Sequence, residues 1–140
     1  AVYFQMDETD VQRILAYPHS MVGSDGLPHD RFPHPRLWGA FPRVLGHYVR
    51  EVGLFSLEAG VHRMTGLSAQ QFHLRDRGIL QPGNFADVVI FDAATILDQS
   101  SFDQPTQPAS GIDYVVVNGA IAWTPNGTTG TRTGKVLRRT

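Results

Sequence analysis

The feature that most restricts the fold of this chain is a change of hydrophobic pattern near residue 78. Before it, apolar residues recur at helical spacing through FPRVLGHYVREVG, LFSLEAGVHRMTG and LSAQQFHL. After it, short apolar runs alternate with turn residues in GILQPGNFADVVIFD, VVVNGAIAWTPNG and TGKVLRR. The sequence therefore predicts an α/β part followed by a β part.

The first part also contains a strand–helix–strand pattern. DETDVQRILAY predicts a helix that Asp7 caps and Pro18 stops, and the short apolar runs AVYF and SMVGSD flank it. This order is typical of a parallel sheet. In the helices that follow, we expect an apolar stripe and further caps: Val44, Leu45, Tyr48 and Val49 for the stripe, Ser68 with Gln71 as a capping box, and Gly53 and Gly66 as C-caps.

In the second part, Asn118-Gly119 between VVV and AIAW predicts a β-hairpin. Residues 94–111, rich in Gln, Pro, Asp and Ser, predict a long connection. About two strands in the first part and four in the second are too few to complete both architectures, since an open sheet or barrel needs about five to eight strands. We therefore expect a C-terminal piece of a larger protein, or a chain that needs another polypeptide.

Composition excludes several classes of function. The 13 acidic and 12 basic side chains give a net charge of −1 without long runs of either sign, which argues against a nucleic-acid or membrane-surface partner and favours a small-molecule one. The 140 residues contain no cysteine, so there is no disulfide framework and no thiolate metal ligand. The start lacks the pattern of a signal peptide or membrane span. We expect a soluble, cytoplasmic protein.

The segment GSDGLPHDRFPHPR, residues 23–36, concentrates groups that bind protons, metals and anions among prolines and glycines that exclude regular structure. From the residues alone, Asp25 between Ser24 and Gly26 is most often a turn former. The histidines lack the H-x-H or H-E-x-x-H spacing of metal sites. They are His19, His29, His34, His47, His62 and His73.

Several longer stretches resemble the N-acyl-D-amino-acid deacylases, the D-aminoacylase branch of the amidohydrolase superfamily. They are YFQMDETDVQRIL, MVGSDGLPHDRFPHPRLWGAFPRVLGHYVRE, LEAGVHRMTGLSAQQFHLRDRGILQPGNFADVVIFD and VVVNG. The resemblance implies a distorted (β/α)8 barrel with a zinc site, and a small β-sandwich built from both chain ends. Residues 1–77 would supply the last strands and helices of the barrel, and residues 78–140 the C-terminal part of the sandwich.

The resemblance also implies the chemistry. Amide hydrolysis needs a group that takes a proton from the attacking water and returns it to the leaving amine. Asp25 matches the family's aspartate at the end of the last barrel strand, which has this role and is a weak metal ligand. The principal zinc ligands would lie outside this chain, so we expect the 140 residues alone to be inactive and not to bind zinc tightly.

Residues near Asp25 are candidates for binding an N-acyl-D-amino acid. The guanidinium of Arg36 suits a carboxylate, and His34 and Ser24 are the other candidates for substrate contact, with His29 a weaker one. We expect Arg75, Asp76 and Arg77 to form surface ion pairs, and Asp87 to have an architectural role.

Two alternatives to the deacylase stay open at this point, so there are three hypotheses in all. The chain is either part of a metal-dependent deacylase or a non-catalytic C-terminal fragment that serves only assembly or binding. A different amidohydrolase, acting on a cyclic imide or a dipeptide, is the third hypothesis. Retention of Asp25 in GSDG favours the deacylase over a purely structural module, and the length of the match around HPRLWGAFPRVLG argues against the other amidohydrolases.

Overall fold

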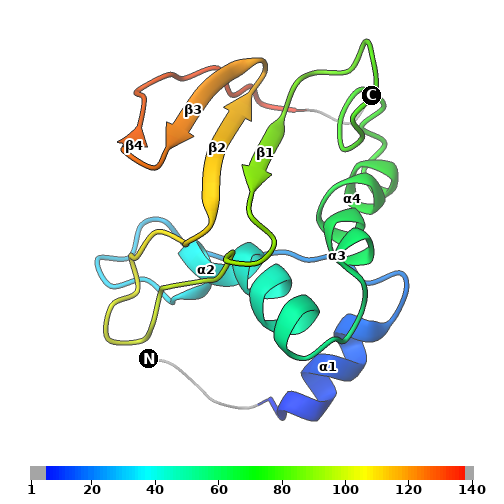
Figure 1. Cartoon of the computed structure of the whole chain (residues 1–140), viewed down its shortest axis with the longest axis vertical. Helices are drawn as coiled ribbons and strands as arrows, with labels where there is room; N and C mark the ends of the chain where they lie inside the picture. Colours follow the sequence, from blue (N-terminus) through cyan, green and yellow to red (C-terminus); the bar gives the residue numbers. More distant parts are fainter. Residues whose placement is uncertain (1–5, 138–140) are drawn as a thin grey trace.

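The computed structural model describes residues 6–137, in which helices come first and an antiparallel sheet follows (Figure 1). The helices lie on one side of the molecule and the sheet on the other. The helices are α1 (Glu8–Ala16), α2 (Arg36–Arg43), the π-helix η1 (Val44–Glu51), α3 (Leu57–Met64) and α4 (Gly66–Gln71). The strands are β1 (Val88–Phe91), β2 (Ile112–Val117), β3 (Ala120–Thr124) and β4 (Gly127–Thr128), paired in that order.

Helix α1 confirms the predicted helix and its cap. The Asp7 side chain accepts a hydrogen bond from the Thr9 backbone N–H at 2.8 Å, and the helix ends just before Pro18. The expected strand AVYF lies outside the described residues. The expected strand SMVGSD is wrong for the described chain, because a strand needs a hydrogen-bonded neighbour and this segment has none among residues 6–137. No parallel pairing therefore occurs in the described sheet.

Other predicted helix ends were partly wrong. Gly53 follows η1 with a φ of 67° and donates its N–H to the Val49 carbonyl, as predicted for a C-cap glycine. Ser68 is not a cap: it lies inside α4, where its hydroxyl donates to the Arg63 carbonyl. Gly66 begins α4 instead of ending α3. The side chain that does cap α3 is Ser56, which accepts from the Ala59 N–H.

The predicted hairpin is confirmed. Asn118 and Gly119 both have positive φ, 48° and 81°, as a type I′ turn requires, and Val117 pairs with Ala120 across it. The expected strand at TGKVLRR is wrong over its described residues, 133–137, and the fourth strand is Gly127–Thr128 instead. This two-residue strand is enough to pair with Trp123 and Thr124.

Arg77 corrects part of the expectation of surface ion pairs: its Nε does lie 4.0 Å from Asp76 Oδ1, but the Arg77 side chain is not on the surface. Its side chain is only 9% exposed, and it pairs with the Asp87 carboxylate and donates to Asn118 Oδ1 at 2.8 Å. Asp87 in turn accepts from the Asn118 backbone N–H, and the Arg77 guanidinium stacks over Phe85. These contacts connect the hairpin turn with the segment that follows the helices, which agrees with the architectural role expected for Asp87.

Helices and sheet are joined by the connection between β1 and β2. Its residues 93–102, called the strap here, run antiparallel to η1 and α2. The Arg50 guanidinium binds the Ile96 and Ala93 carbonyls at 2.6 and 3.2 Å, and a Cβ built on Gly46 would lie 2.6 Å from the Ile96 carbonyl oxygen. Only glycine at position 46 therefore allows this close approach.

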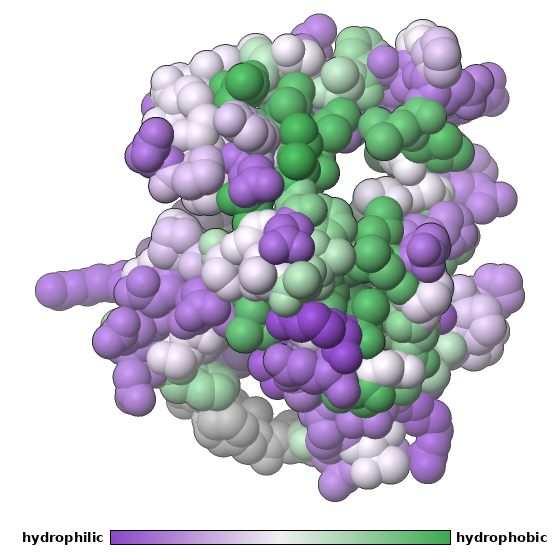
Figure 2. Space-filling model, viewed as in Figure 1, coloured by the Kyte–Doolittle hydropathy of each residue, from purple (hydrophilic) through white to green (hydrophobic). Residues whose placement is uncertain are grey.

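Ile96 is 2% exposed and belongs to a small buried core. Its other hydrophobic members are Val44, Leu45, Tyr48 and Ala69, which confirms most of the predicted stripe. Other hydrophobic side chains stay on the surface, and Figure 2 shows them along the boundary between the sheet and the helices. No helix within residues 6–137 is long and apolar enough to cross a membrane.

Replacing Gly46 with alanine should destabilise the chain. The added methyl would meet a backbone carbonyl that η1 and Arg50 hold in place, so we expect the free energy of unfolding to fall by about 1–3 kcal/mol. Urea denaturation measures this change. Gly134→Ala is the control, because a Cβ there meets nothing within 4 Å; equal stability of the two variants would contradict the close packing of the strap.

Candidate functional site

The loop before α2 folds back onto the first turn of that helix. Asp25 has a φ of 48°, a left-handed conformation that aspartate tolerates better than most residues. At Gly26 a Cβ would lie 2.6 Å from Leu37 Cδ1 and 2.8 Å from its Cα, so glycine is needed for the contact. The Ser24 hydroxyl accepts from the Gly26 N–H at 3.3 Å and helps to form this turn. The fold thus brings Asp25 to the N-terminal end of α2.

Arg36 binds Asp25 at two points. Its Nη2 lies 2.8 Å from Asp25 Oδ2, and its Nε donates to the Asp25 backbone carbonyl at 3.0 Å. The side chains are 41% and 82% exposed, so water screens the ion pair and it adds little to stability. Its effect is geometric: one guanidinium fixes both the backbone and the carboxylate of the same residue.

His34 orients Arg36 from the other side. Its Nδ1 accepts the backbone N–H of Arg36 at 3.1 Å, which requires this nitrogen to be unprotonated. Burial, and then the positive charge of Arg36, lower the pKa of His34 below its ordinary value. The ring also meets Phe102 of the strap edge to face, with centroids 5.2 Å apart.

The predicted residues therefore lie together: Ser24, Asp25 and His34 are on the loop before α2, and Arg36 is the first residue of that helix. His29 is exposed and makes none of the hydrogen bonds found among residues 6–137. Sequence reasoning missed Phe102, which lies 68 positions after His34, since nothing in the local pattern around it indicates a contact so distant in sequence.

These residues do not form a complete metal site. Over the described part of the chain, no three His, Cys, Asp or Glu side chains are grouped to bind a metal. A catalytic zinc usually takes three protein ligands, and the only acidic member of the group described above is Asp25. Among the described residues, this group therefore offers a single carboxylate.

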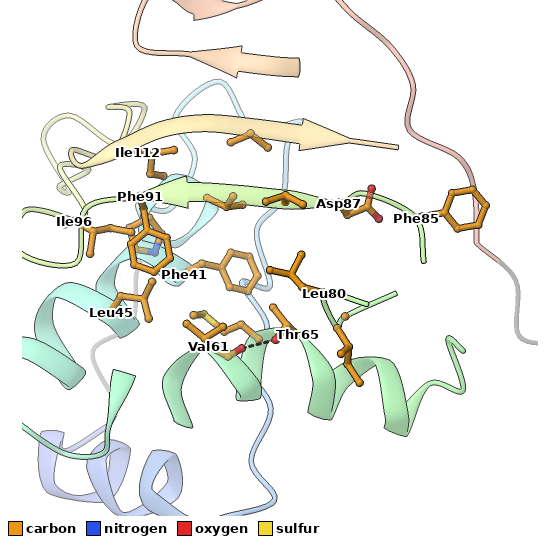
Figure 3. A pocket seen from close by; sticks show the side chains of 17 residues that line it. Phe41, Leu45, Val61, Thr65, Leu80, Phe85, Asp87, Phe91, Ile96 and Ile112 are labelled. Carbon is orange, nitrogen blue, oxygen red and sulfur yellow. Dashed lines mark hydrogen bonds between the residues drawn. The ribbon is translucent and has the colours of Figure 1, made fainter. Parts of the chain in front are cut away.

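A separate cleft of about 630 Å3 lies between the helices and the sheet (Figure 3). Phe91 extends into it from strand β1 and Phe41 from helix α2, and most of its lining is apolar. Its one charged lining residue, Asp87, is already paired with Arg77. The cleft lacks groups for hydrolysis, so the Asp25 group is the better candidate site.

Comparison with known proteins gives one family. The amidohydrolase family model matches residues 4–122. D-aminoacylase of Alcaligenes xylosoxydans xylosoxydans is 60% identical over 100% of the chain, and N-acyl-D-glutamate deacylase of the same organism is 53% identical over 99%. The chain spans 29% and 28% of the lengths of these two relatives.

Solved structures agree with the sequence comparison. A crystal structure of D-aminoacylase matches with a TM-score of 0.95 and 59% identity, covering 98% of this chain and 29% of that one. N-acyl-D-glutamate deacylase from Bordetella bronchiseptica, complexed with zinc and a phosphonate mimic of the tetrahedral intermediate, matches with a TM-score of 0.92 and 54% identity, covering 97% of this chain and 28% of that one. The resemblance inferred from the sequence is thereby confirmed.

The pKa of His34 gives a test of this geometry. The pKa of His34 lies below its ordinary value of 6.5 in the folded chain, so the unfolded chain binds more protons than the folded chain once the pH falls below 6.5. The free energy of unfolding should therefore fall as the pH drops below 6.5. An NMR titration of His34 in the folded chain and in urea measures the shift directly. His34→Asn should remove the part of the pH dependence of stability that comes from His34. A pKa of 6.5 or higher for His34 in the folded chain would contradict this geometry.

Proposed function

The chain belongs to the amidohydrolase family, and on that premise we propose that it is part of a metal-dependent deacylase that hydrolyses N-acyl-D-amino acids to a carboxylate and a free D-amino acid. The observation that carries this proposal is the Asp25 carboxylate, which is exposed on a turn, with Arg36 bound both to it and to the Asp25 backbone carbonyl. The relatives named above, a D-aminoacylase and an N-acyl-D-glutamate deacylase, support this substrate class.

Asp25 is the proposed proton carrier. Its carboxylate accepts a proton from the water that attacks the amide carbonyl, and then donates it to the nitrogen of the departing amino acid. The side chain is 82% exposed in the described chain, so a substrate can reach it. We also propose Asp25 as a weak ligand of the metal.

Zinc is the proposed cofactor, with its main ligands outside this chain. When bound, zinc supplies Lewis-acid activation of water and of the substrate carbonyl. The relatives support this choice, because one solved deacylase contains zinc and D-aminoacylase is described as having a binuclear metal centre.

Arg36, His34 and Ser24 are proposed to bind the substrate. A guanidinium has five N–H donors, and the contacts with Asp25 use two of them. Arg36 can therefore hold Asp25 and the α-carboxylate of an N-acyl-D-amino acid at once. This arrangement would place the substrate amide beside the proton carrier.

The larger architecture is also a proposal. Residues 1–77 would contribute the last strands and helices of a (β/α)8 barrel, and residues 78–140 part of a β-sandwich. The helices up to Gln71 and the antiparallel sheet from Val88 support this division. The partner would be the N-terminal portion of the same enzyme, because the segment SMVGSD needs neighbouring strands and the buried core is small.

Asp25→Ala in the complete enzyme should lower turnover of an N-acetyl-D-amino acid by about 10²–10⁴-fold, because proton transfer loses its carrier. Release of the free D-amino acid measures turnover, and circular dichroism checks that the fold is kept. Asp30→Asn is the matched control, a second exposed carboxyl on the same loop. Near-normal turnover of Asp25→Ala would remove Asp25 from the mechanism and favour a non-catalytic role for this segment.

A further inference from the structure

The strap continues beyond the core and reaches the candidate site. After Ile96 it reaches the C-terminal end of helix α2, where Asp98 lies 3.5 Å from the Arg43 guanidinium, and it then follows the helix towards its N-terminus. A Cβ on Gly39 would lie 2.5 Å from Ser100 Oγ and 3.0 Å from Asp98 Cβ. Gly39, like Gly46, therefore has no side chain on the helical face that the strap contacts, and the strap can approach α2 closely.

The strap ends against the residues that precede α2. The Ser100 hydroxyl donates to the Pro35 carbonyl at 3.0 Å in a partly buried position. Two residues later, the Phe102 ring meets the His34 ring at 82°, an edge-to-face arrangement that aromatic pairs prefer. The strap therefore contacts both residues immediately before Arg36.

A chain of direct contacts links Phe102 to the proposed proton carrier. Phe102 packs on His34, whose Nδ1 accepts the N–H of Arg36. The Arg36 side chain then binds the carboxylate and the backbone carbonyl of Asp25. Rotation of the His34 ring would break the hydrogen bond between His34 Nδ1 and the Arg36 backbone N–H, which is the first hydrogen bond of this chain of contacts.

We propose that Phe102 is a positioning residue of the deacylase: by fixing the His34 ring it sets the placement of Arg36, and through Arg36 that of Asp25. The inference rests on the proposed function and extends it to a residue of the connection between β1 and β2. Connections longer than about 12–15 residues without helices or strands are usually functional, and this one spans residues 92–111.

Simple core packing does not account for Phe102. Its side chain is 44% exposed, whereas Ile96 in the same strap is 2% exposed. The strap is also fastened independently by Arg50 and by the Leu97–Ser110 bridge. Loss of the Phe102 ring should therefore leave the strap attached and the fold stable, while the site at its end loses its alignment.

The test uses the complete zinc-loaded enzyme that contains this chain. For Phe102→Ala we expect kcat to fall about tenfold or more, since small misplacements of catalytic groups are costly, with KM, zinc content and melting temperature close to wild type. Phe102→Tyr keeps the ring and should restore most of kcat. Phe32→Ala is the matched control, because Phe32 is an exposed phenylalanine on the loop before α2, and it should keep wild-type kcat.

Three outcomes would overturn the proposal. Wild-type kcat in Phe102→Ala would show that the ring positions nothing. A rise in KM that varies with the acyl group, at unchanged kcat, would make Phe102 a substrate contact. A lowered melting temperature with equal loss of kcat in Phe102→Tyr would make it a packing residue. Asp25→Asn is assayed in parallel to separate the role of Phe102 from the proposed function. Only full turnover in Asp25→Asn would count against the proposed function; the three outcomes for Phe102 would not.

Discussion

The close approach of the strap to the face of α2 and η1 is the constraint on which the other features depend. The strap can lie there only because Gly39 and Gly46 have no side chains, and Arg50 then binds its carbonyls. This contact buries Ile96, the most deeply buried hydrophobic residue of the described core, and joins the helices to the sheet. It also brings Phe102 to the loop of Asp25.

The candidate site combines a close-packed support with an exposed carboxylate. Gly26 packs on Leu37, and Arg36 fixes Asp25 through its backbone as well as its carboxylate. Because the carboxylate is screened by water, its pairing with Arg36 contributes orientation more than stability. A proton carrier needs this arrangement, since it must be placed accurately and yet stay open to the substrate. The chain spans less than a third of its relatives' length.

Local chemistry made part of the fold predictable. The cap at Asp7 and the Asn118-Gly119 turn depend on neighbouring residues, and both were correct. The candidate residues around Asp25 came from the loop sequence and the family resemblance, and their function stays a prediction. What failed depends on distant residues: SMVGSD lacks the neighbouring strands that it would need among the described residues, and the Arg77 side chain is largely covered, with Asp87 and Asn118 as partners. The contact of Phe102 with His34 could not be predicted either, because no local pattern indicates which loop a connection will reach.

The central claim is that Asp25 is the proton carrier and is held in place through Arg36. A crystal structure of the complete zinc enzyme with a substrate analogue tests it most directly. The account predicts an Asp25 carboxylate oxygen about 2.6–3.2 Å from the atom that represents the attacking water, with Arg36 Nε still on the Asp25 carbonyl. An Asp25 side chain turned away from the analogue, with Arg36 released from it, would contradict the account.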